Sequence, residues 1–328
     1  MTDELTGTSA DAALPQNWLR LLARLRVLLM QTAVPGAPLA ELSAIETRAH
    51  ALLEADPDEG LFVLFQALDD VSHGYCATHA LLCAVVCALT AEKLGLAPAP
   101  RQALFRAALL MNLGMAQAQD QLARQSALPN DAQRKLIREH PEKSLALLRA
   151  FGLQDPDTLD MVRWHHDSDA LGALPHNQTL RRLLHCADNF VAKMAPRKTR
   201  LAMSPLGAAN ALGHNAASDT DTSALVSAMA QSVGFYPPGT FVQLLNGEKA
   251  VAVARGLHAN TPHVMSVVGA DGMPLRPYRY LDTSQPHCAI RSPLNAEKIK
   301  VKVALIDVVQ VLQQHRTELG VKADDTPA

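Results

Sequence analysis

The chain has 328 residues, of which 48% are hydrophobic and only 4% aromatic, and its net charge is −2. This length favours two domains, or one large domain with an extension. The composition favours helices over sheets, because Ala, Leu and Val must fill the core. The near-neutral charge argues against bulk binding to nucleic acid or to an anionic membrane.

The chain shows neither a signal peptide nor a membrane span, which predicts a cytoplasmic protein. The most apolar run, residues 80–91, is too short to cross a bilayer. The cysteines have no CxxC spacing, and three of them lie on one apolar stretch; they are Cys76, Cys83, Cys87, Cys186 and Cys288. We interpret them as reduced core residues rather than as disulfides or a zinc site.

The N-terminal region, residues 1–59, is predicted to be a helical extension. Residues 1–16 are polar and are expected to be disordered, while residues 18–31 and 39–54 have helical patterns separated by a Pro-Gly break. The first helix carries an apolar stripe made of Leu19, Leu22, Leu25, Leu28 and Leu29. This stripe either packs on the chain's own domain or contacts a partner or a second copy of the chain.

Residues 60–235 are expected to form the main helical domain, and residues 236–328 a small β-rich segment with a polar tail. The predicted helices cover residues 76–93, 100–113, 131–150, 155–165 and 179–194, and residues 217–222 are predicted to be a polar loop. Two hairpin signals follow, around Asn246-Gly247 and Asp271-Gly272. The fold class is therefore mainly α, a helical bundle with an N-terminal extension and a C-terminal β appendix.

Five polar side chains lie in apolar surroundings along this helical domain: His79, His140, His165, His166 and Asp188. A single histidine on an apolar face is usually a satisfied core residue. A carboxylate within an apolar helix is rarer, because its burial requires a partner or a metal ion. Imidazole and carboxylate together suit Fe, Mn or Zn, and helices of a bundle can direct such groups inward.

The order and spacing of these residues resemble the HD-GYP branch of the HD-domain metal-dependent phosphohydrolases. The resemblance covers about residues 61–282 and rests on "HALLCAVVCALTAEKLGL", "REHPEKSLALL", "MVRWHHDSD" and "CADNFVAKMAPRKTRLAMSP". It implies an HD-domain-like helical bundle, hydrolysis of the bacterial messenger cyclic di-GMP, and a cluster of metal ions. His79, His140, His165, His166 and Asp188 would be metal ligands, and Arg197 and Arg200 would contact phosphate.

The segment "AALLMNLGM" departs from the family pattern. Where the family has a His-Asp pair, this chain has Met111 and Asn112, and Met115 replaces a lysine. The Gly-Tyr-Pro signature expected after the two adjacent histidines is also absent, and "DSDALGALPHN" stands there. In the family the aspartate bridges two ions, which at 4 Å would repel by about 17 kcal/mol at an effective dielectric constant near 20. Asn112 is neutral and a poor bridge, and a Met111 thioether suits Cu(I) instead.

These substitutions predict a catalytically impaired protein that keeps at most one divalent ion (Fe, Mn or Zn) or none. Any such ion would be bound by His140, His165 and His166, because that ligand set is complete. The leading interpretation is a regulatory or partner-binding protein of cyclic di-GMP signalling, with a signalling protein or a homodimer as partner. An active phosphodiesterase with a mononuclear or rearranged site, and a non-hydrolysing nucleotide sensor, are the alternatives. No nucleic-acid or membrane partner is expected.

Overall fold

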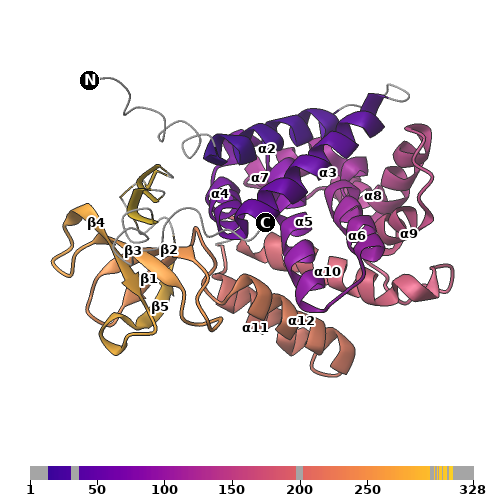
Figure 1. The fold of residues 1–328 in the computed structure, drawn as a ribbon. Coiled ribbons are helices and arrows are strands. Elements are labelled where there is room, and N and C mark those ends of the chain that lie inside the picture. The colour runs from indigo at the N-terminus through magenta and orange to yellow at the C-terminus, as the bar shows by residue number, and fades with distance from the viewer. Residues whose placement is uncertain are drawn as a thin grey trace, which may run out of the picture.

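The structure is a computed structural model that describes residues 14–30, 37–196, 202–295 and, with gaps, 299–312. The helices form one packed body and the strands form a separate small sheet beside it (Figure 1). This arrangement confirms the predicted fold class: mainly α, with a small C-terminal sheet.

The helical part is built from consecutive helices. These are α2 (Leu14–Met30), α3 (Ala37–Ala55), α4 (Pro57–Asp69), α5 (Tyr75–Lys93), α6 (Pro98–Leu110), α7 (Ala116–Arg124), α8 (Asp131–Ala150), α9 (Pro156–Trp164), α10 (Gln178–Met194), α11 (Pro205–Asn215) and α12 (Thr220–Val233). Single 3₁₀ turns are η1 (Val71–His73), η2 (Leu113–Met115), η3 (Pro175–Asn177) and η4 (Pro286–Cys288).

Local capping chemistry sets where several helices begin. Asp56 accepts backbone N–H groups of α4 and is followed by Pro57, whose missing N–H costs nothing at the first helical position. Asn130 and Gln133 form a capping box at the start of α8. The Asp219 carboxylate accepts the N–H groups of Asp221 and Thr222 at the start of α12. The predicted loop at 217–222 is therefore wrong at its C-terminal end, where the helix starts at Thr220.

Helix α5 is the centre of the helical part. It contacts α2, α4, α6, α7, α10 and α12, and nearly all of its residues are buried. Its 19 residues make it long and apolar enough to cross a membrane by length and composition, but 89% of the most apolar window is buried inside the protein. The apolar run that the sequence analysis considered, residues 80–91, is therefore shorter than the apolar helix that contains it. The burial of α5 is that of a core helix.

The N-terminal helices share the hydrophobic core of the helical part. Leu22, Leu25, Leu28 and Leu29 of α2 are at most 3% exposed, and α2 contacts α3, α4 and α5. Only Leu19 of the predicted stripe remains 37% exposed. The stripe therefore packs on the chain's own domain, as one of the two interpretations held, and it is not free for a partner.

The predicted domain boundary at residues 59 and 60 lies inside α4. Residues 1–13 lie outside the described part of the chain. Because α2 begins at Leu14, the predicted end of the disordered segment, residue 16, lies inside a helix.

The C-terminal sheet is antiparallel throughout, with strand order β4-β3-β2-β1-β5. Its strands are β1 (Phe241–Leu244), β2 (Lys249–Ala254), β3 (His263–Val268), β4 (Pro274–Asp282) and β5 (Ile290–Leu294). Both predicted hairpins are confirmed, whereas β5 was not predicted. Val251 and Ala250 belong to different hydrophobic clusters, as expected for neighbouring residues on the two faces of a sheet.

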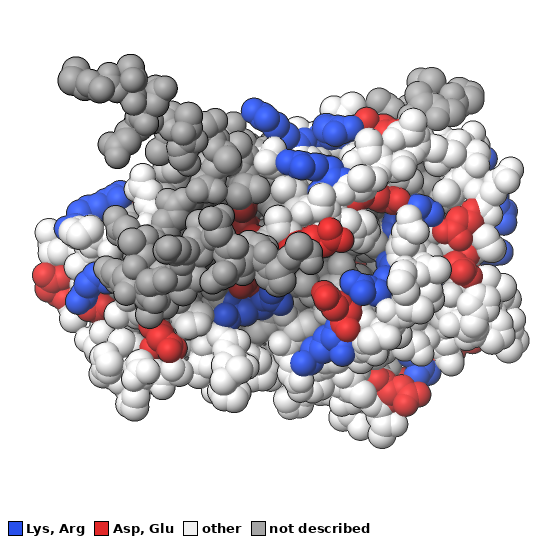
Figure 2. All heavy atoms as spheres, viewed as in Figure 1, with Lys and Arg blue, Asp and Glu red and all other residues white. Residues whose placement is uncertain are grey.

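The sheet is attached to the helical part through α4. Phe62 of α4 belongs to the same hydrophobic cluster as Phe241, Val251 and Met265 of the sheet. On the face shown in Figure 2, acidic and basic side chains are interspersed among neutral ones, in line with the net charge of −2.

Candidate metal centre

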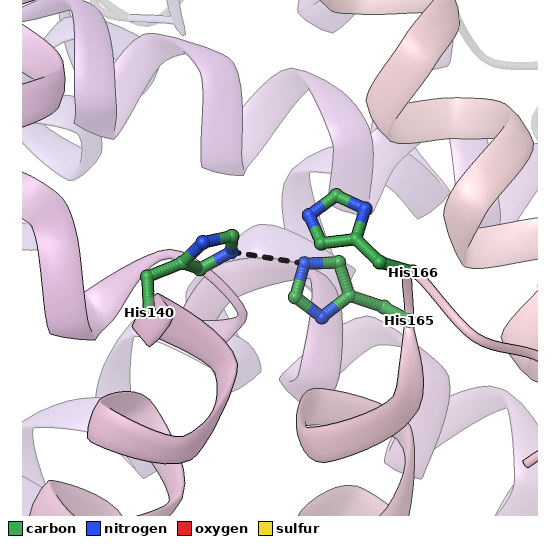
Figure 3. A group of neighbouring side chains, drawn as sticks. All are labelled: His140, His165 and His166. Atoms are coloured by element: carbon green, nitrogen blue, oxygen red, sulfur yellow. Dashed lines mark hydrogen bonds between the residues drawn. The ribbon is translucent and has the colours of Figure 1, made fainter. Parts of the chain in front are cut away.

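Three histidines converge at one point. His140 lies in α8, His165 directly follows the last residue of α9, and His166 comes next (Figure 3). One ring nitrogen of each lies within 4.8 Å of a ring nitrogen of the other two. The structure therefore brings together the three residues that the sequence predicted as one ligand set, which we call the three-histidine cluster.

Main-chain hydrogen bonds fix two of these rings. Nδ1 of His140 is 2.7 Å from the carbonyl oxygen of Ile137, and Nδ1 of His165 is 2.8 Å from that of Val162. A carbonyl oxygen can only accept, so both Nδ1 atoms carry the hydrogen. The neutral rings then present Nε2 lone pairs to each other across 3.1 Å. Two acceptors at that distance need a shared proton or a metal ion between them.

The surroundings disfavour the shared proton. Burial lowers the pKa of His140 to about 4 and the pKa of His165 to about 3, and neighbouring imidazoles add to both shifts. Desolvation also lowers the pKa of His166, although this side chain reaches solvent. Neutral imidazole is the form that binds a metal ion, and ligands about 2.1 Å from one ion lie about 3.0–3.4 Å apart. The cluster thus fits a divalent ion such as Fe, Mn or Zn.

The other two predicted ligands form a second group, which contains a residue that the sequence analysis had assigned to the core. His79 Nε2 is 2.7 Å from Asp188 Oδ1, and Cys83 Sγ is 3.5 Å from the same His79 nitrogen. Their ligand atoms all lie within 4.8 Å of one another. Spacing is the signal that could have found Cys83, since it follows His79 by four residues on one helix face.

Asp188 connects the two groups electrostatically. Burial alone would raise its pKa, but the hydrogen bond to His79 and the nearby rings of His165 and His166 outweigh burial and hold the pKa of Asp188 below its usual range. The ring of His185, one helical turn earlier on α10, lies 5.8 Å from that of His166. Its buried Nδ1 has no hydrogen-bond partner within the described structure. The sequence analysis did not single out His185.

Met111 and Asn112 do not offer a charged pair of metal ligands. Helix α6 ends at Leu110, three residues before the predicted end, and the chain then turns into η2. Met111 is 0% exposed and belongs to the main hydrophobic core. Asn112 is buried, and its Nδ2 has no hydrogen-bond partner among the described atoms. Met115, at the end of η2, is half-buried.

Helix α8 is held tightly against this turn. The Ser144 hydroxyl donates to the Met111 carbonyl oxygen and accepts the Gly114 N–H. A Cβ atom on Gly114 would lie 2.6 Å from the His140 carbonyl oxygen, so only glycine allows this approach. The turn therefore still positions His140, although it supplies no charged ligand.

The loop after His166 is fixed by a buried ion pair that the sequence analysis missed. Arg181 of α10 lies 2.5 Å from Asp160 of α9 and also donates to the carbonyl oxygens of Ser168 and Leu174. Asp160 in turn accepts the Leu174 N–H. This network connects the loop that follows His166, in which the Gly-Tyr-Pro signature is absent, to α9 and α10. Arg197 and Arg200, the predicted phosphate contacts, lie outside the described residues.

Comparison with known proteins gives one informative match. No protein-family model matches the chain, and neither does any curated protein. Among solved structures, the chain is similar to Bd1817, an HDG"Y"P protein from Bdellovibrio bacteriovorus, with a TM-score of 0.51 and 13% sequence identity. The similarity covers 68% of this chain and 73% of that one. It shows that this chain has an HD-GYP-like fold.

Proposed function

We propose that this protein is a catalytically impaired HD-GYP-like protein of bacterial cyclic di-GMP signalling, which acts in the cytoplasm by binding a signalling partner or the nucleotide rather than by turnover. The HD-GYP-like fold and the three-histidine cluster support the family part of this proposal. The buried Met111 and the neutral Asn112 support the impaired part.

The chemistry of phosphodiester hydrolysis explains why those two positions matter. A reaction of this type needs an activated hydroxide and charge neutralisation at the phosphate, which bound metal ions supply. His140, His165 and His166 would bind one ion, and all three are neutral ligands. Met111 directs its side chain into the core, and Asn112 adds no negative charge. Met115 provides no cation for the phosphate.

One observation carries the proposal: Met111 has become a fully buried core residue beside an intact three-histidine cluster. Turnover would need a charged ligand in that turn, whereas binding of a partner or of the nucleotide does not. The substituted segment is also well packed, since Ser144 and Gly114 lock it against α8.

The test combines turnover and binding on the same preparation. The purified full-length protein is loaded with Mn²⁺ or Fe²⁺ and incubated with cyclic di-GMP, while chromatography follows the linear product and equilibrium dialysis follows bound nucleotide. We expect no product above the protein-free control. Bound nucleotide without product would identify a sensor, and absence of both would point to a protein partner. Sustained turnover would overturn the proposal and establish the enzymatic alternative.

A further inference from the structure

We propose that His79, Cys83 and Asp188 form a second metal site, of the zinc type, in which the Cys83 thiolate is a ligand. This inference does not rest on the proposed function, because it concerns metal binding alone. The sequence analysis had expected at most one ion per chain and had assigned Cys83 to the core; this proposal replaces both expectations.

The distances fit such a site after a small movement. Zinc binds sulfur at about 2.3 Å and nitrogen at about 2.0–2.1 Å, so tetrahedral S and N ligands lie about 3.6 Å apart. Cys83 Sγ and His79 Nε2 are 3.5 Å apart. The His79–Asp188 contact, 2.7 Å, is a hydrogen bond and would open to about 3.3 Å around an ion.

Neighbouring groups orient these ligands. Tyr75 Oη lies 3.3 Å from Nδ1 of His79, one turn earlier on α5. In the metal-free protein Nε2–H of His79 donates to Asp188; when a metal ion displaces this proton, Nδ1–H can donate to the Tyr75 oxygen, and the Nε2 lone pair then faces both Cys83 and Asp188. Metal-bound histidines commonly have such a partner on the second ring nitrogen.

Charge distinguishes this group from the three-histidine cluster. A thiolate and a carboxylate together neutralise a divalent ion, so the His79–Cys83–Asp188 group can hold one without leaving net charge in the interior. The thiolate also changes the metal preference, since soft sulfur favours Zn²⁺ and Co²⁺ over Mg²⁺ and Mn²⁺. The group is well enclosed, with His79 and Cys83 at most 1% exposed.

Cobalt substitution tests the thiolate directly. The metal-free full-length protein is titrated with Co²⁺ while the near-ultraviolet thiolate-to-cobalt charge-transfer band is recorded. We expect the wild-type protein to develop the band and to lose it when Zn²⁺ is added. Cys83→Ser should lose the band and one equivalent of bound metal. Cys87→Ser is the matched control, because Cys87 is equally buried one turn further along α5 but lies outside the group.

The outcomes separate this site from the other. His166→Ala should keep the band, because it changes only the three-histidine cluster. A wild-type protein without the band would overturn the proposal, and that measurement does not depend on any variant folding. A band that persists in Cys83→Ser, or one that disappears in Cys87→Ser, would also overturn it. Loss of cyclic di-GMP binding would leave this inference unaffected.

Discussion

The two ligand groups differ in how the protein holds them. In the three-histidine cluster, main-chain carbonyl oxygens of Ile137 and Val162 fix the rings of His140 and His165. In the His79–Cys83–Asp188 group, His79 and Asp188 are held by a side-chain contact with each other, and of these described side chains only the Cys83 thiol donates to a main-chain carbonyl oxygen, that of Ala187. The first group is therefore preorganised by the main chain of α8 and α9. It can therefore stay intact beside a substituted Met111-Asn112 segment, whereas the second depends on which side chains are present.

Breaking the support of the three-histidine cluster should have the largest effect. Arg181→Met leaves Asp160 buried without its partner, and removing one member of a buried ion pair costs about 3–5 kcal/mol. Denaturant unfolding of the metal-free protein measures this loss. The double variant Asp160→Leu with Arg181→Met should recover much of the stability, because no charge remains unpaired. A change below 1 kcal/mol in Arg181→Met would contradict the assigned role.

Removing one ligand should affect the two groups differently. His166→Ala should weaken metal binding at the three-histidine cluster by roughly 10–100-fold, since each ligand contributes strongly to affinity. His176→Ala is the matched control, because this exposed histidine follows in the same loop and pairs with Asp157, away from the cluster. Competition with a chromophoric chelator measures the affinity. Equal losses in both variants would show that the loop, and not the ligand, is responsible.

Of the two groups, only the three-histidine cluster should make the stability of the metal-free protein depend on pH between pH 7 and pH 5. His140 and His165 have folded pKa values of about 4 and about 3, below the unfolded value near 6.5, so the unfolded chain binds more protons between these values. Their contribution to stability is complete above the unfolded pKa and is lost as the pH falls. We expect a loss of about 2 kcal/mol for each of the two histidines between pH 7 and pH 5.

Asp188 provides the comparison for this pH dependence. Its lowered pKa means that its contribution is present above its unfolded value and is lost only at more acidic pH. Asp188→Asn should therefore leave the difference between pH 7 and pH 5 unchanged, whereas His140→Gln should reduce it. Denaturant unfolding at both pH values, with a chelator present, measures these differences. An unchanged difference in His140→Gln would contradict the account.

Restoring charge beside both groups should have the smallest effect. The double change Met111→His with Asn112→Asp adds a possible ligand pair, so we expect metal content to rise by up to one equivalent. Activity should remain low, because Met115 and the loop anchored by Arg181 are unchanged. Elemental analysis and the cyclic di-GMP assay measure the two quantities. A fall in metal content would show that the turn cannot direct a side chain toward the clusters.

Sequence patterns predicted the parts of this molecule that depend on local order. Helical periodicity and capping residues located α5, α8 and α10, and the Asn-Gly turn located the first hairpin. The histidines of the three-histidine cluster were predicted through their resemblance to a family motif, and the structure brings them together.

Patterns could not predict contacts between distant segments. Asp160 and Arg181 lie 21 residues apart, and nothing in either neighbourhood indicates that they meet in the interior. Cys83 was assigned to the core because its neighbours are apolar, and only the approach of Asp188 from α10 shows another role. Strand β5 contains Pro293, which weakens a strand signal, but an edge strand tolerates proline.

Anomalous diffraction from crystals of the metal-loaded protein tests the central claim most directly, namely that the three-histidine cluster is a metal site. The account predicts an anomalous peak at the absorption edge of the bound metal, within bonding distance of Nε2 of both His140 and His165 and of a nitrogen of His166. Absence of a peak there, with the two Nε2 atoms still in contact in metal-loaded crystals, would contradict it.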